Sequence, residues 1–190
     1  MYYGEKVCLR ALEMSDLEKI LDHWNTFEMR RFLGTAFPMS ENAERDWLER
    51  ATKSRPWKDG EIVLAIEHKK TKKFLGTISL FDISKQSRRA ELGIAIHNKA
   101  NFGKGYGTDA IRVILWMGFH ILGLHSIYLY HASFNERGRR AYEKAGFKPV
   151  GAFREGVYME GARHDLMAMD ILKNEFLKEY PPGSRVGNPP

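Results

Sequence analysis

The sequence predicts an α/β fold with a mixed, mostly antiparallel central sheet and flanking helices. Three observations indicate this class. Apolar segments of strand length recur along the chain, and segments with helical spacing stand between them. The glycine-rich run at residues 102–110 also follows a strand and opens a helix. That unit should form a right-handed strand–helix–strand crossover, which makes one strand pair parallel.

The N-terminal part of the chain predicts one strand and two helices. Residues 7–12 have the apolar character of a short strand. Ser15 and Asp16 then offer an N-cap for a helix whose apolar residues recur at helical spacing. Ser40 precedes a second helix, which we expect at residues 41–51.

The middle of the chain predicts three strands and a long helix. Strands at residues 62–67 and 74–81 are joined by a polar turn, which is typical of a hairpin. A third strand at residues 90–96 leads into the glycine-rich run. The helix that follows should begin near Thr108 and end at Gly123.

The C-terminal part predicts a strand, a helix and a closing antiparallel pair. The strand covers residues 126–132, and the helix is capped by Asn135 and ends before Gly146. The closing pair is expected at residues 152–158 and 164–172. All of these elements alternate without a linker, so the sequence predicts one folded unit.

Length and composition fit a single globular domain. The chain has 190 residues, of which 43% are apolar and 28% are charged. We expect one domain over residues 1–178 and a flexible Pro/Gly-rich tail at residues 179–190. Since no apolar stretch approaches about 20 residues and no signal-peptide core is visible, we expect a cytoplasmic protein without a membrane partner.

The charge balance leaves two interpretations open. The net charge of +6 indicates either an anionic partner, such as a phosphorylated cofactor or RNA, or a solvated lysine-rich surface. Nucleic acid is not expected, because no aromatic RNA-binding motif is present. Cys8 lies in an apolar run and is expected to be structural. The seven histidines lack the spacing of a zinc site, so we expect no metal.

The glycine-rich run is a candidate anion site. Gly103, Gly105 and Gly107 alternate, and residues without Cβ let a bulky anion lie against the main chain. The following helix adds its free N–H groups and the positive end of its dipole. The run has neither a P-loop ending nor a complete dinucleotide pattern, so alone it predicts a tight turn as readily as a phosphate site.

Asn135 and Tyr142 are a second candidate pair. Two helical turns separate them, so both side chains project along one helix face. Such residues are ordinarily an N-cap and a core tyrosine. Their position after the glycine-rich run makes the combination more specific.

Together these segments resemble the GCN5-related N-acetyltransferase (GNAT) superfamily. The likeness rests on the strand AELGIAI, the loop FGKGYGT and the segment NERGRRAYEKAGF. The opening LRALEMSDLEKI and the ending GVYMEGARHDLMAMDIL resemble the branch of ribosomal-protein and polyamine acetyltransferases. Phe102 departs from that pattern, because Gln or Arg is usual at its position.

The resemblance implies acetyl-CoA as the cofactor. The family separates two parallel strands and places the cofactor between them, with its diphosphate on main-chain amides and its pantetheine arm paired like an added strand. By position, the cofactor would be bound by Ile94, Ala95, Ile96, Phe102, Gly103, Lys104, Gly105, Tyr106, Gly107, Thr108 and Asn135.

The resemblance also implies catalytic roles. Tyr142 matches the family's general acid, which would protonate the leaving thiolate. Glu91 stands where some members have a catalytic base, although an ion pair with Arg88 or Arg89 or a water relay are alternatives. A strand N–H near Ile94 or Ala95 would stabilise the oxyanion.

The acceptor is expected to be a primary amine, either a protein N-terminus or a small polyamine. Its site would be built from the first two helices and the turn near Glu160, with Trp24, Phe32 and Tyr158 as the other candidate substrate-binding residues. The competing interpretation is a non-catalytic acyl-CoA-binding module or a basic ribosome- or RNA-associated protein. Whether the chain forms a homodimer stays open.

Overall fold

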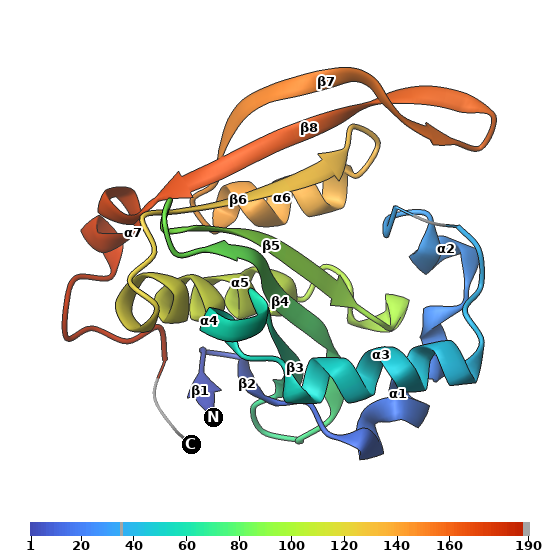
Figure 1. The fold of residues 1–190 in the computed structure, drawn as a ribbon, viewed down its shortest axis with the longest axis horizontal. Helices are drawn as coiled ribbons and strands as arrows, with labels where there is room; N and C mark the ends of the chain where they lie inside the picture. The colour runs from blue at the N-terminus through green and yellow to red at the C-terminus, as the bar shows by residue number, and fades with distance from the viewer. Residues whose placement is uncertain (35, 188–190) are drawn as a thin grey trace.

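The chain folds around one eight-stranded sheet, shown in Figure 1. The structure is a computed structural model and describes residues 1–34 and 36–187. The strand order is β1-β2-β3-β4-β5-β6-β8-β7, and all neighbours are antiparallel except the parallel pair β5 and β6. The predicted α/β class is confirmed. The strands are β1 (Tyr2–Tyr3), β2 (Val7–Ala11), β3 (Ile62–His68), β4 (Phe74–Ser84), β5 (Arg89–Ile96), β6 (Ser126–Ala132), β7 (Lys148–Met159) and β8 (Ala162–Leu172).

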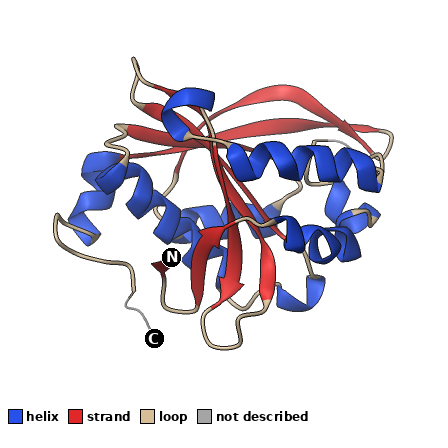
Figure 2. Ribbon diagram, turned by 60° about the horizontal axis from the view of Figure 1, so that its bottom comes forward, coloured by secondary structure: helices blue, strands red, loops and turns tan. Residues whose placement is uncertain are grey.

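Helices lie on both sides of the sheet, as Figure 2 shows in blue against the red strands. None of the described helices is long and apolar enough to cross a membrane. The helices are α1 (Leu17–Trp24), α2 (Phe27–Arg30), α3 (Glu41–Lys53), α4 (Pro56–Asp59), α5 (Tyr106–Trp116), α6 (Glu136–Lys144) and α7 (Lys173–Glu179), with 3₁₀ turns at Met14–Asp16 and Lys99–Asn101 and a π-helical turn at Met117–Ile121.

Strand β3 separates two hydrophobic cores. Successive strand residues point to opposite faces, and here both faces are covered. Leu64 and Ile66 join the larger core around α5, whereas Val63 and Ala65 join a smaller core under α1 and α3. Because Ile66 is fully buried, its truncation to alanine should cost about 2–5 kcal/mol.

The predicted long strands and helices are present, and short elements were missed. α2, α4 and α7 were not anticipated, because four to seven residues carry little periodic signal. α5 begins at Tyr106, two residues before the expected start, because Gly105 adopts a left-handed conformation (φ 83°) at its N-cap. Ser40 caps α3 through its side chain, as predicted.

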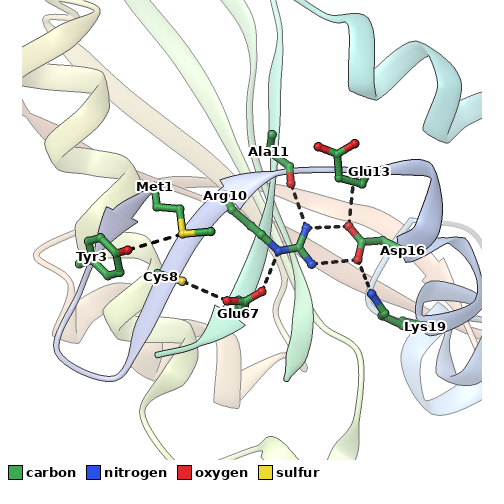
Figure 3. Close-up of polar contacts among 9 residues, drawn as sticks. All are labelled: Met1, Tyr3, Cys8, Arg10, Ala11, Glu13, Asp16, Lys19 and Glu67. Carbon is green, nitrogen blue, oxygen red and sulfur yellow. Dashed lines mark hydrogen bonds and ion pairs between the residues drawn. The ribbon is translucent and has the colours of Figure 1, made fainter. Parts of the chain in front are cut away.

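A buried ion cluster joins β2 to the start of α1 (Figure 3). Arg10 donates to Asp16 at 2.7 and 2.9 Å and to Glu67 at 2.8 Å, and Lys19 also donates to Asp16. Asp16 stands at the N-cap position of α1, but the expected side-chain cap is wrong, because its carboxylate makes no cap hydrogen bond to α1. Burial alone would raise the pKa of Asp16, yet the hydrogen bonds from Arg10, Lys19 and the Glu13 N–H lower it to about 2.

The C-terminal segment follows α5 rather than leaving the domain at once. Trp116 Nε1 donates to the Ser184 carbonyl at 2.9 Å. Gly187 lies against Gly4, since a Cβ at position 187 would overlap the Gly4 backbone. The flexibility expected for residues 179–190 stays a prediction, and residues 188–190 lie outside the described part.

Candidate active site

The parallel strands β5 and β6 are paired at one end only. Their register joins Arg89 to Ser126, Ala90 to Ile127 and Glu91 to Tyr128. Beyond this point β5 continues along β4 as far as Ile96, while β6 continues along β8. The facing edges of β5 and β6 therefore separate, and polar main-chain groups at the β5 edge are left for a ligand.

A cavity of about 550 Å³ lies between these separated strands and the glycine-rich loop. This volume is in the range of small-molecule sites. The structure brings most of the predicted cofactor residues together on its wall. The predicted residues that line it are Phe32, Ile94, Ala95, Ile96, Phe102, Gly103, Gly105, Tyr106, Gly107, Thr108, Asn135 and Tyr142.

The glycine-rich loop presents the free end of α5 to the cavity. Gly103 (φ 72°) and Gly105 (φ 83°) adopt left-handed conformations that disfavour other residues. Gly105 is the N-cap of α5 and has no side chain to accept from the first N–H groups of that helix. These N–H groups and the helix dipole make the loop a site for an anion. Lys104, the remaining predicted loop residue, is exposed and is not part of the cavity wall.

The described lysines and arginines that line the cavity were not predicted as site residues: Lys6, Arg112, Arg137, Arg140 and Lys144. Lys6 Nζ donates to the Lys104 carbonyl at 2.9 Å. The Arg137 guanidinium lies 3.6 Å from the ring centre of Phe102 and 5.3 Å from that of Phe32. The sequence shows Arg137 among several basic residues at 137–148. Lys6 had no sequence signal, because 98 residues separate it from Lys104.

Tyr142 is a buried titratable group on the cavity wall. Its ring lies 5.8 Å from that of His131. Burial disfavours the phenolate and raises the pKa of Tyr142 to about 12, although Arg137 acts in the opposite direction. The phenol therefore holds its proton at neutral pH. No hydrogen bond joins its hydroxyl to another described side chain, and Tyr142 lines the cavity.

Asn135 has a structural role as well as a place on the cavity wall. Its Oδ1 accepts from the Gly138 N–H at 3.0 Å and caps α6. The ordinary interpretation of this asparagine as an N-cap is thus correct. The cap fixes the start of α6 beside the cavity, and Tyr142 follows two turns later.

Glu91 is not brought to the cavity. It occupies the last paired position of β5, opposite Tyr128 on β6. Its neighbours Ala90 and Leu92 point into the larger core, so the Glu91 side chain faces the other side of the sheet. Burial and the charge of Asp82 raise its pKa. Within the described residues it forms no ion pair with either neighbouring arginine.

The four candidate acceptor residues are not gathered in one place. Phe32 lines the cavity, and Glu160 lies near the same region because it pairs with Arg31 at 2.9 Å. Trp24 instead packs against His97, with the ring centres 4.8 Å apart, and Tyr158 is 65% exposed. Neither of these two lines the cavity. Among residues 1–34 and 36–187, no cluster of side chains has the composition of a metal site.

Comparison with known proteins agrees with this geometry. Residues 6–148 match the family model of the acetyltransferase (GNAT) domain. The spermidine N-acetyltransferase of Vibrio cholerae, solved in complex with CoA and spermine, superposes with a TM-score of 0.82 at 28% identity. That similarity covers 92% of this chain and 99% of the other.

Two curated relatives are similar over a shorter stretch. YdaF of Bacillus subtilis (strain 168), a provisionally assigned ribosomal N-acetyltransferase, is 36% identical over 101 residues, 53% of this chain. The spermidine N(1)-acetyltransferase of Escherichia coli (strain K12) is 30% identical over 105 residues, 55% of this chain. These matches span 55% and 56% of the respective relatives. The family model matches most of the length of this chain. The chain therefore belongs to the GNAT acetyltransferase family.

Proposed function

We propose that this protein transfers the acetyl group of acetyl-CoA to a primary amine. The observation that carries the proposal is the single cavity wall shared by the β5 edge, the uncapped start of α5 and the Tyr142 phenol. Membership of the GNAT family and the CoA bound to a structural neighbour support it.

The cofactor would lie along the gap between β5 and β6. Its diphosphate would accept hydrogen bonds from main-chain N–H groups of residues 103–108. Its pantetheine amides would pair with the β5 edge at residues 94–96, as an added strand does. Asn135 would offer its amide to the same arm. This arrangement would direct the thioester toward Tyr142, which lines the same cavity.

The chemistry then needs three contributions from the chain. The neutral amine attacks the thioester carbonyl, the C–N bond forms, and a main-chain N–H near Ile94 or Ala95 stabilises the oxyanion. As the C–S bond breaks, Tyr142 donates its proton to the sulfur, and its phenolate regains the proton that the new amide nitrogen loses through water. Burial raises the pKa of that phenol to about 12, so it holds its proton until negative charge develops on the sulfur.

The attacking ammonium must first lose a proton. Glu91 is a base of suitable type, because burial raises its pKa toward neutrality. Since its side chain does not line the cavity, we propose that it acts through water rather than by direct contact. Bulk water at the cavity mouth is the alternative acceptor of this proton.

The cavity lining favours a peptide N-terminus over a polyamine. Among the described lining residues the carboxylates are Glu5 and Asp109, both beside the glycine-rich loop. The segment around α2 and strand β6 contribute Met29, Phe32 and Tyr130, none of which attracts a second ammonium group. A polycation would lack the paired carboxylates that hold its other amines.

An acceptor panel tests the proposal directly. Thiol release from acetyl-CoA is followed with peptides, spermidine and spermine, and calorimetry with CoA is run in parallel. We expect CoA binding, thiol release with peptides and slower release with polyamines. CoA binding without release from any amine would favour the non-catalytic binding module, and no CoA binding would contradict the proposal.

A further inference from the structure

We infer that Lys6 binds the cofactor's phosphates and that Asp109 is the positioning residue that holds Lys6 there. The inference rests on the proposed use of acetyl-CoA. It adds the turn between β1 and β2 to the diphosphate site, which the sequence pattern assigns to the glycine-rich loop alone.

Asp109 fastens the β1–β2 turn to the start of α5. Its buried carboxylate accepts from the main-chain N–H groups of Glu5 (3.0 Å), Lys6 (2.8 Å) and Val7 (2.9 Å). An acidic residue in the first turn often accepts from its own helix. Here the carboxylate is directed to another segment, so the first N–H groups of α5 stay free for a ligand.

The contact requires an unusually close approach of the turn. A Cβ at Gly4 would overlap the Asp109 carboxylate, so only glycine fits at that position without a shift. Gly4 is also fixed by a hydrogen bond from its N–H to the Val7 carbonyl at 2.9 Å. The backbone of residues 4–7 therefore has one orientation relative to α5.

This orientation directs the Lys6 side chain over the glycine-rich loop. Its ammonium donates to the Lys104 carbonyl and would lie 3.1 Å from a Cβ at Gly105. An ammonium has three N–H donors, so two remain after the bond to Lys104. Lys6 lines the cavity beside Gly105 and Tyr106, where the diphosphate is proposed to lie.

The charge of Lys6 is not used elsewhere. Among the described residues it forms no ion pair within 4.0 Å, whereas Lys19 and Lys148 each pair with a carboxylate. An uncompensated ammonium at an uncapped helix N-terminus adds to the same positive potential. A purely structural role, fixing the loop through the Lys104 carbonyl, would not need a charge.

The test compares ligands with and without phosphates. Calorimetry with CoA and with pantetheine is carried out on the wild type and on Lys6→Met, Lys6→Arg and Lys70→Met. For Lys6→Met we expect about tenfold weaker CoA binding, unchanged pantetheine binding, a higher KM for acetyl-CoA and an unchanged kcat. Lys6→Arg should recover most of the affinity, and Lys70→Met, an equal charge loss outside the cavity, should bind as the wild type does.

Asp109 is tested through its coupling to Lys6. Asp109→Asn should weaken CoA binding about fivefold. In the Asp109→Asn background, Lys6→Met should then reduce CoA affinity by a smaller factor than it does in the wild type. Gly4→Ala disturbs the same contact from the other side and serves if Asp109→Asn does not fold. If Lys6→Met weakened CoA and pantetheine binding equally, the inference would be wrong. It would also be wrong if Lys6→Met bound CoA as tightly as Lys70→Met does. Either result would leave the proposed function intact. A wild type that binds no CoA would overturn both.

Discussion

The Arg137 guanidinium lies 3.6 Å from the ring centre of Phe102, so α6 and the glycine-rich loop meet across the cavity. Phe102 stands where the related pattern has Gln or Arg. Here the aromatic ring gives the loop a cation–π contact with the helix that carries Tyr142. Both residues line the cavity, and the contact holds its two walls together.

Phe102→Ala should loosen this wall without removing any catalytic group. We expect the KM for acetyl-CoA to rise about threefold with kcat unchanged, since a cation–π contact contributes roughly 0.5–1 kcal/mol. Steady-state kinetics measures both constants. Arg139→Met is the control, because Arg139 lies on the same helix but pairs with Glu136 and Glu143 at the surface. A Phe102→Ala enzyme with the wild-type KM would contradict the prediction.

Tyr142→Phe should lower kcat roughly 100-fold or more and leave CoA affinity unchanged, because the phenol acts on the leaving sulfur. The raised pKa, about 12, also predicts that ionisation of this residue does not limit the rate below about pH 11. Single-turnover rates across pH check both statements. Tyr106→Phe, a second tyrosine of the cavity wall, should keep its activity. Undiminished turnover in Tyr142→Phe would remove the phenol from the mechanism.

Glu91→Gln tests the proposed base. A carboxylate accepts a proton only when ionised, so a raised pKa shifts the loss of rate on acidification to higher pH. In the variant this acidic limb should flatten, and the rate at neutral pH should fall. The readout is the pH profile of kcat/KM with a peptide acceptor. A profile identical to that of the wild type would assign the proton to water instead.

Asp16→Asn should destabilise the fold in a pH-dependent manner. The pKa of Asp16 is lowered from 3.8 to about 2, so its stabilisation is complete above the unfolded value and is lost as the pH falls toward the folded value. We expect a loss of about 2 kcal/mol at pH 7 that shrinks steadily below about pH 4. Urea unfolding at pH 7 and below about pH 4 measures this loss of stability. Lys19→Met, which removes the half-exposed partner, should cost less than about 1 kcal/mol.

Local patterns made the fold and the centre of the site predictable. Alternating burial identified the strands, the glycines identified the start of α5, and the seven-residue spacing placed Asn135 and Tyr142 on one helix. The orientation of Glu91 was also readable, because its apolar neighbours Ala90 and Leu92 must occupy the core face. Strand alternation then turns the glutamate to the opposite face.

Contacts between distant segments were not predictable. Arg31 meets Glu160 across 129 residues, and Lys6 meets Lys104 across 98. No single-sequence pattern encodes such pairs, because they depend on how the sheet brings its strands together. Asp16 failed as a helix cap for a different, local reason, because Arg10, six residues earlier on β2, binds its carboxylate.

The short paired stretch between β5 and β6 has a consequence for how the two parts of the sheet are joined. In the described part of the chain, those three residue pairs are the ladder that joins β1–β5 to the group β6–β8–β7. Acetyl-CoA lying in the gap would supply the missing hydrogen bonds between the two groups of strands. Amide exchange at alternate positions of residues 92–96 should therefore slow on loading, while the doubly paired β3 changes little.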